Sequence, residues 1–227
     1  LAEFLGTEKA ILFSTGFMAN LGVLTSLFDK KDLIVQDKLN HASLLDGGLA
    51  SEARMIRYAH NDMDSLQRQL KQSAESKLIV TDGVFSMDGD VAPLDKIAAI
   101  KQVEQAQLMV DDAHGFGALG ETGRGSMEQL NLEQNVADIY MATLGKAVGG
   151  FGAFVAGSHL LIESLVQFAR SYIYTTAMPP ALAAANRMGL QLVQSEPERR
   201  QNLVSNIKYF RAYAREKMLP LSDSDTA

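Results

Sequence analysis

The amino-acid sequence predicts an α/β protein in which a mostly parallel central sheet is flanked by helices. Two observations lead to this fold class. Short apolar or β-branched runs alternate with longer segments of helical period along the chain, which is the pattern of strands joined by crossover helices. The chain also has 227 residues, of which 47% are hydrophobic and 21% charged, so it is long enough and apolar enough to bury a large core.

The first half of the chain alternates predicted strands and helices one by one. Apolar or β-branched runs predict the strands, and segments with apolar residues three and four positions apart predict the helices. The helix at 93–106 opens with Pro93, which suits the first turn of a helix. The run that ends at Asp111 and Asp112 is expected to be a central strand. The predicted strands are 10–14, 33–37, 54–59, 77–85 and 107–112, and the predicted helices are 16–28, 43–52, 63–74 and 93–106.

The second half is predicted to add two strands and then a series of helices. The strands cover 137–144 and the glycine-rich 151–157, and helices follow at about 158–170 and 180–194. After the stretch QSEPERR a charged helix is expected to run to about Met218, since Pro220 cannot continue it. We expect residues 1–195 to form a large domain without its amino-terminal segment, and 196–227 to begin a small carboxy-terminal domain whose remainder is absent.

Composition and charge argue against several classes of protein. The formal net charge is −6 and no run of Lys or Arg is present, whereas a nucleic-acid partner would require a basic surface. The lack of cysteine excludes disulfides, a thiolate metal site and a cysteine nucleophile, and it fits a reducing compartment. No apolar run approaches the roughly 18 residues of a membrane span, and residues 1–10 lack the features of a signal peptide. We therefore expect a cytoplasmic protein that binds neither nucleic acid nor membranes.

Polar residues follow five of the predicted strands directly. In sheets of this kind, ligands bind at the carboxyl ends of the strands, in the crevice where the connections diverge. The loops after these five strands are therefore expected to converge on one site. The segments concerned are 14–16, 37–41, 82–86, 111–114 and 143–146.

The segment GFGALG, residues 115–120, has the glycine spacing of a dinucleotide-binding motif. That motif requires a helix to open at its last glycine, with the pyrophosphate at the helix N-terminus. Here Gly120 is followed by ETGRGSM, whose glycines make a helix start there implausible, so we disfavour a dinucleotide site. Asp111, Asp112 and His114 have the residue types of a metal site, but adjacent strand residues point to opposite faces, so at most one aspartate faces a site with His114.

Lys146 lies between glycines just after a predicted strand, in the stretch TLGKAVGG. Taken alone, it is best interpreted as a surface lysine in a flexible loop, although a buried amine would have a lowered pKa and act as a nucleophile. The other loops supply what pyridoxal phosphate (PLP) requires besides a lysine: an acid for the pyridine nitrogen, a ring to stack on it, donors to the phenolic oxygen and an anion cradle. The sequence therefore makes Lys146 a candidate for PLP binding.

Each further PLP requirement has a candidate, and each candidate has an ordinary structural alternative. Asp111, which could pair with the ring nitrogen, could be a turn or capping aspartate. The start of the helix at 16–28 could hold a phosphate through its free backbone N–H groups, or its Ser and Thr could simply cap it. A histidine at a helix start is usually structural, and a turn rich in Asp and Gly needs no function. The other candidates are Ser14, Thr15, Gly16, His41, Asp82, Ser86 and His114.

Seven motifs in order along the chain resemble the α-oxoamine synthases, which are PLP enzymes of the aspartate aminotransferase fold (fold type I). The similarity covers nearly all of residues 1 to about 200. It implies a PLP-dependent transferase with residues 1–195 as the PLP-binding domain. It also implies a homodimer with active sites shared between subunits. The motifs are STGFMAN, NHASLLDG, AHND, DGVFSMDGDVAPL, VDDAHGFGALGETGRG, TLGKAVGG and YIYTTAMPPA.

The resemblance implies a role for each candidate residue. Lys146 would bind the cofactor covalently, Asp111 would pair with the pyridine nitrogen and His41 would stack on the ring, and these three form the expected catalytic set. The remaining cofactor contacts would be His114 and Ser86 to the phenolic oxygen, and Gly16, Phe17 and Thr143 to the phosphate.

The resemblance also implies contacts beyond this set. Thr175 and Thr176, in YIYTTAMPPA, would reach the phosphate of the neighbouring subunit. Asp82 stands where the family pattern commonly has Glu. Its side chain is one methylene shorter, at a position that would support the residues in contact with the cofactor. The arginine that usually holds the substrate carboxylate is expected in the part of the family fold that this sequence lacks.

The implied reaction is a decarboxylative condensation of an amino acid with an acyl thioester. SMDGDVAPL and YIYTTAMPPA look most like the biotin-pathway branch of the family, which implies L-alanine and pimeloyl-CoA or pimeloyl-acyl carrier protein as substrates. A sibling reaction, glycine with acetyl-CoA giving 2-amino-3-oxobutyrate, would use the same cofactor site. A non-catalytic family subunit is a further alternative, but such a subunit should have lost Lys146.

Overall fold

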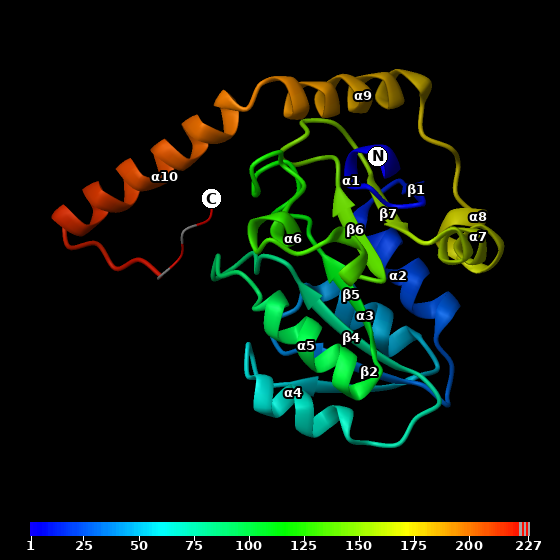
Figure 1. The fold of residues 1–227 in the computed structure, drawn as a ribbon. Coiled ribbons are helices and arrows are strands. Elements are labelled where there is room, and N and C mark those ends of the chain that lie inside the picture. The colour runs from blue at the N-terminus through cyan, green and yellow to red at the C-terminus, as the bar shows by residue number, and fades with distance from the viewer. Residues whose placement is uncertain (223, 225, 227) are drawn as a thin grey trace.

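The computed structural model describes residues 1–222, 224 and 226, and a seven-stranded sheet forms its centre (Figure 1). The strand order is β1-β7-β6-β5-β4-β2-β3. Only β7 runs against its neighbours, and the pairs among β2, β3, β4, β5 and β6 are all parallel. The fold class predicted from the sequence is confirmed. The strands are β1 (Lys9–Phe13), β2 (Leu33–Asp37), β3 (Arg54–Tyr58), β4 (Lys77–Asp82), β5 (Gln107–Asp111), β6 (Ile139–Thr143) and β7 (Ala153–Gly157).

Helices cover both faces of this sheet. One face packs against α2 (Gly16–Leu27), α3 (Ala42–Ala50), α7 (His159–Phe168) and the segment leading into α8 (Arg170–Ile173). The other packs against α1 (Ala2–Leu5), α4 (Met63–Leu70), α5 (Leu94–Glu104) and α6 (Ser126–Gln129). The remaining helical elements are the 3-10 helix η1 (Gln134–Val136), α9 (Pro180–Ser195) and α10 (Glu198–Glu216).

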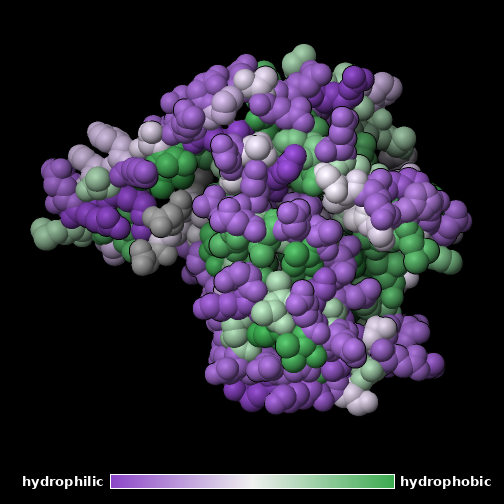
Figure 2. Space-filling model, in the orientation of Figure 1, coloured by the Kyte–Doolittle hydropathy of each residue, from purple (hydrophilic) through white to green (hydrophobic). Residues whose placement is uncertain are grey.

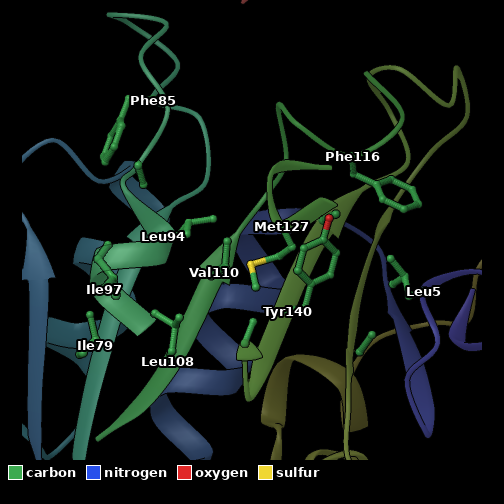
Figure 3. Packing of buried hydrophobic residues seen from close by; sticks show 14 of the residues in the cluster. Leu5, Ile79, Phe85, Leu94, Ile97, Leu108, Val110, Phe116, Met127 and Tyr140 are labelled. Atoms are coloured by element: carbon green, nitrogen blue, oxygen red, sulfur yellow. The ribbon is translucent and has the colours of Figure 1, made fainter. Parts of the chain in front are cut away.

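The two cores are built by alternate residues of the same strands, because successive strand side chains point to opposite faces. On β5, Leu108 and Val110 join the core on the α5 side, which Figure 3 shows with Leu94 and Ile97 of α5. Met109, between them, belongs to the core on the α2 side. The same alternation assigns Asp111 to the α2 side of the sheet.

Several predicted boundaries were wrong for local physical reasons. The strand predicted to reach residue 85 ends at Asp82, because the chain then forms a turn closed by Phe85 N donating to Asp90 O at 3.0 Å. The helix predicted at 158–170 is divided at Ala169, whose ψ of 101° is not helical. The last helix begins at Glu198, directly after Pro197, and not after QSEPERR. The short α1, α6 and η1 were not predicted, since a single turn carries no periodic signal.

The last two helices differ in how they contact the rest of the molecule. Figure 1 shows α9 lying across one end of the sheet, while α10 extends away from it. Arg200 attaches the start of α10, since its Nη2 donates to the carbonyl of Glu121 at 2.8 Å. Within the described part of the chain, no helix has both the length and the apolar character that crossing a membrane requires.

Candidate active site

One pocket lies where the loops after β1, β2, β4, β5 and β6 meet. β1 runs parallel to β6, because both pair antiparallel with β7, so all five strands present their carboxyl ends at one edge of the sheet. All eight residues that the sequence proposed as cofactor contacts line this pocket. The lining residues are Gly16, Phe17, His41, Ser43, Asp82, Ser86, Asp111, Ala113, His114, Met141, Thr143 and Lys146.

The start of α2 forms the part of the pocket suited to an anion. Thr15 caps this helix by accepting a hydrogen bond from Met18 N at 3.1 Å. Gly16 and Phe17 line the pocket in the first turn, where the helix dipole and backbone N–H groups favour negative charge. A Cβ at Gly16 would lie 2.9 Å from Thr143 Cγ2, so glycine permits the helix start to approach the end of β6 closely.

Asp111 lies at the buried floor of the pocket and is held there by neutral donors. Its Oδ2 accepts a hydrogen bond from Asn20 Nδ2 at 2.7 Å, and its Oδ1 accepts one from Ala113 N at 3.1 Å. Burial raises the pKa of Asp111, against the lowering effect of these donors. A cation placed in the pocket would therefore stabilise this carboxylate.

A hydrogen-bonded chain links Asp111 to His41 across α2 and α3. Asn20 Nδ2 also donates to Ser43 Oγ at 2.8 Å, and Ser43 Oγ lies 2.8 Å from His41 Nδ1. Asn20 is fully buried, and Ser43 nearly so. The orientation of the His41 ring is thus set by side chains that also fix Asp111.

Asp82 is a second buried carboxyl on the same side of the sheet. Its Oδ2 accepts a hydrogen bond from His41 N at 2.9 Å, which ties the end of β4 to the start of α3. Burial and the neighbouring Asp111 carboxylate raise the pKa of Asp82 to about 8. Two buried carboxyls that face one pocket repel each other when both are ionised, so they keep one proton between them most readily.

Lys146 and His114 lie together at the pocket mouth. Lys146 Nζ is 2.9 Å from His114 Nε2. Burial lowers the pKa of Lys146, against the opposite effect of the Asp111 and Asp82 carboxylates. Burial and the nearby Lys146 and His41 lower the pKa of His114. Both pKa shifts favour the neutral forms of the His114 imidazole and the Lys146 amine. Because the two nitrogens lie within hydrogen-bond distance, a proton can pass between these two side chains.

Asp112 points to the other face of the sheet, as the alternation predicted. Its Oδ2 accepts hydrogen bonds from Tyr140 Oη at 2.7 Å and from Ser126 N at 2.8 Å. Cβ atoms at Gly115 and Gly125 would overlap with its carboxylate oxygens, so both glycines are required for the loop to fold around it. Asp112 thus attaches the loop to the sheet and does not line the pocket.

The glycine-rich loop at 117–125 is not a phosphate cradle. The backbone N–H groups of Gly120 and Arg124 donate to Gln129 Oε1 at 3.1 Å and Glu128 Oε2 at 3.0 Å. Glu128 also accepts from the backbone and hydroxyl of Thr122. Gly117 N, within the motif, donates to Gly123 O at 2.8 Å. Because side chains and carbonyls of the chain itself occupy the donors that a pyrophosphate would need, the GFGALG motif is structural, as its sequence context indicated.

Sequence reasoning missed four pocket or pocket-supporting residues. Asn20 lies four residues after Gly16, so helical spacing could have placed both on the same face of α2. Met141 is two residues before Thr143 on β6, on the same side of the sheet. Ser43 and Ala113 carry no signal of their own. Thr175 and Thr176 do not reach this pocket; they line a separate hollow with Phe13 and Tyr172.

The fold and the site define the class of the protein. The chain belongs to the class I and II aminotransferase family, whose profile matches residues 1–227. It is 57% identical over 225 residues to an 8-amino-7-oxononanoate synthase of Cellvibrio japonicus, covering 99% of this chain and 56% of that protein. It is 55% identical over 224 residues to that of Methylococcus capsulatus, covering 98% of this chain and 58% of the relative. The chain thus spans little more than half the length of these curated relatives.

Solved structures agree with this assignment. A serine palmitoyltransferase from S. paucimobilis, solved with bound PLP and myriocin, superposes with a TM-score of 0.95 at 34% identity, covering all of this chain and 57% of that one. An 8-amino-7-oxononanoate synthase from Francisella tularensis superposes with a TM-score of 0.87 at 40% identity, covering all of this chain and 66% of that one. Both are therefore similar to this chain over its whole length.

Proposed function

We propose that the protein is a PLP-dependent acyltransferase that condenses L-alanine with a pimeloyl thioester. The thioester is carried on CoA or acyl carrier protein, and the products are 8-amino-7-oxononanoate, CO2 and the free thiol. The observation that carries the proposal is the convergence of the eight candidate cofactor contacts on one pocket. The names of the relatives at 54–57% identity support the choice of reaction and its place in biotin biosynthesis.

The residues of the pocket fit PLP. A protonated pyridine nitrogen would place a positive charge beside the buried carboxyls. Asp111, at the floor of the pocket, would pair with this nitrogen and keep it protonated. The α2 N-terminus at Gly16 and Phe17, together with Thr143, is suited to the phosphate. His41 would stack on the ring, while Ser86 and His114 would donate to the phenolic oxygen. Sites for the phosphate and the ring nitrogen therefore come from separate strand ends of one sheet.

The chemistry follows from what these side chains can do to the bound groups. PLP, when bound, withdraws electrons from the α-carbon of the amino acid. Lys146 is the base that takes the α-proton and later returns it, because its lowered pKa makes the neutral amine accessible. Asp111 keeps the proton on the ring nitrogen throughout. Asn20 and Ser43 connect His41 to Asp111, so the cofactor ring stacked on His41 and the Asp111 carboxylate would keep fixed relative positions.

We infer further that the active protein is a homodimer in the cytoplasm. The hollow that contains Thr175 and Thr176 is separate from the chain's own pocket, and the side chain of Tyr174, next to Thr175 in the chain, is exposed. Figure 2 shows hydrophobic side chains reaching the surface at its right-hand side, where α7 and α8 lie. These features support a second copy of the chain as the partner that covers this side. The lack of cysteine supports a reducing compartment.

Substrate assays on the whole protein test the proposed reaction. With PLP present, L-alanine and pimeloyl-CoA should give CO2 and free CoA with steady turnover. Glycine with acetyl-CoA and L-serine with palmitoyl-CoA are the comparison pairs, the latter because serine palmitoyltransferases share the fold. Efficient turnover of either pair without turnover of L-alanine and pimeloyl-CoA would assign the protein to a sibling reaction. A lack of turnover with every pair would favour a non-catalytic family member.

A further inference from the structure

A polar cluster outside the pocket joins β2 and the segment after β3 to the turn that carries Ser86. We define the His60 cluster as His60, Asn61, Asp37 and Asp90. His60 Nδ1 lies 2.9 Å from Asp37 Oδ1, and His60 Nε2 lies 2.8 Å from Asp90 Oδ2. The proposed reaction uses none of these four residues. One imidazole therefore bridges the carboxylate at the end of β2 and the carboxylate on the turn that carries Ser86.

Asp37 is the fixed end of this bridge. Its side chain is fully buried at the end of β2. Its Oδ1 also accepts from Leu39 N at 2.8 Å, and its Oδ2 accepts from Asn61 N at 2.9 Å. Partial burial lowers the pKa of His60, but the hydrogen bonds and charges of Asp37 and Asp90 outweigh it and raise that pKa. In the protonated imidazole, which this environment favours, both ring nitrogens donate and both hydrogen bonds are charge-assisted.

Asp90 is the end of the bridge that belongs to the turn of residues 83–92. The turn is closed by Phe85 N donating to Asp90 O at 3.0 Å, and Val84 pairs with Val91 below it. Asp90 Oδ2 accepts a second hydrogen bond from Asn61 Nδ2 at 2.6 Å. The His60 ring also packs edge-on against Phe85, with ring centroids 4.5 Å apart, and Figure 3 shows Phe85 on this turn. The His60 cluster thus contacts both residues that close the turn.

We propose that His60 is a positioning residue, which bridges Asp37 and Asp90 and thereby holds the turn of residues 83–92 at the pocket so that Ser86 stays directed at the cofactor. Ser86 directly follows Phe85, lines the pocket and lies on the hydrogen-bonded turn that the bridge holds. The side chain of Met87, at the tip of this turn, is 90% exposed and gives the turn little packing of its own. The proposal rests on the proposed PLP site.

Two substitutions of the same residue separate the two halves of the bridge. In His60→Asn, the amide nitrogen is placed near the position of Nδ1 and can still donate to Asp37, but residue 60 no longer reaches Asp90, which keeps its hydrogen bond from Asn61 Nδ2. In His60→Gln, the longer side chain places its amide nitrogen near the position of Nε2, within reach of Asp90. His159→Asn is the matched control, because His159 is an exposed histidine far from this turn. It lies on α7, which follows β7 near one end of the strand order, whereas the turn follows β4 toward the other end. Thermal unfolding establishes that each variant is folded.

The first measurement is amide hydrogen exchange of residues 84–91 in the cofactor-free whole protein. We expect exchange in this turn to accelerate about tenfold or more in His60→Asn, less in His60→Gln and not at all in His159→Asn. Unchanged exchange in His60→Asn would overturn the proposal. This measurement does not depend on the proposed function, because no cofactor is present.

The second measurement is the affinity for PLP, followed by the change of its visible absorption on binding. We expect the dissociation constant to rise about tenfold in His60→Asn and to stay closer to that of the unmodified protein in His60→Gln. Faster exchange of the turn with unchanged PLP affinity would overturn the positioning role and leave His60 as a stabilising residue only. If the unmodified protein binds no PLP, the proposed function itself fails, and with it the role of His60 toward the cofactor.

Discussion

At the scale of single residues, two adjacent aspartates have separate tasks because a strand end sends them to opposite faces. Asp111 accepts from Asn20 of α2 in the pocket, while Asp112 accepts from Tyr140 and Ser126 on the far side of the sheet. Asp111 is therefore available to a ligand cation, whereas Asp112 is already committed to the protein. Substituting each in turn should give different kinds of loss.

We expect Asp111→Asn to keep PLP bound but to slow turnover on the order of a thousandfold or more, because an amide stabilises a protonated ring nitrogen far less than a carboxylate does. Asp112→Asn should instead lower the free energy of unfolding by about 1–3 kcal/mol through its weakened buried hydrogen bonds, with turnover per folded molecule changed only a few-fold. Steady-state kinetics and denaturant unfolding of both variants measure this. Near-normal turnover in Asp111→Asn would contradict the role of that residue.

Asp82 predicts how the stability of the cofactor-free protein depends on pH. Its pKa is raised from 3.8 to about 8 by burial and by Asp111, so between these values the folded protein binds a proton that the unfolded chain releases. The free energy of unfolding should therefore fall as the pH rises through this interval and level off above it. Asp82→Asn should reduce this slope, since the amide has no proton to lose. Denaturant unfolding at a series of pH values with an unchanged slope in the variant would refute the assignment.

At the scale of secondary-structure elements, the site depends on how closely the start of α2 approaches the end of β6. Gly16 permits this approach, and Thr143, a β-branched residue with few rotamers, is the neighbour that a larger side chain would meet. The clash involves only Cγ2 of Thr143. A second substitution that removes this methyl group should therefore relieve it.

We expect Gly16→Ala to weaken PLP binding about tenfold by moving the α2 N-terminus away from the phosphate position. Adding Thr143→Ser, which keeps the hydroxyl but lacks Cγ2, should restore most of the lost affinity. Thr143→Ser alone serves as the control, and equilibrium titrations give the dissociation constants. If the double variant binds no better than Gly16→Ala, the effect is not a clash between these two elements.

How much the sequence could predict follows from the same elements. The apolar runs predicted the strands, and the rule that ligands bind at strand ends grouped residues as far apart along the chain as Gly16 and Lys146. Side-chain partners were not predictable, because Asn20 meets Asp111 only once α2 packs against β5, 91 residues away in sequence. The same holds for the end of β4. The apolar residues Val84 and Phe85 led to a strand prediction that extended to residue 85, and the contact of His60 with Asp90, 30 residues away in sequence, could not be predicted.

At the scale of the whole molecule, exposed apolar side chains lie at the pocket and next to the separate hollow. Phe17, which lines the pocket, is 43% exposed. The hollow containing Thr175 and Thr176 lies beside Tyr174, which is 73% exposed. Elsewhere, α10 extends from the body with exposed aromatic side chains, which supports our proposal that residues 196–227 belong to a second structural unit.

A homodimer should therefore be sensitive to charge at Tyr174. We expect the whole protein to sediment as a dimer, and Tyr174→Asp to shift it toward monomer with loss of turnover, because the interface would have to desolvate the new carboxylate. Val103→Asp is the matched control, since Val103 is also exposed but lies on α5, across the sheet from α7 and α8. Fully active monomers at assay concentration would exclude shared active sites.

The central claim is that Lys146 binds PLP in this pocket, and chemical labelling tests it most directly. The whole protein is incubated with PLP, reduced with borohydride so that the lysine linkage becomes permanent, and digested for peptide mapping by mass spectrometry. The account predicts one modified peptide that carries the cofactor on Lys146, and no such peptide from a Lys146→Ala variant treated in the same way. Stoichiometric labelling of another lysine would contradict the account, and so would the absence of any label on the protein that carries no substitution.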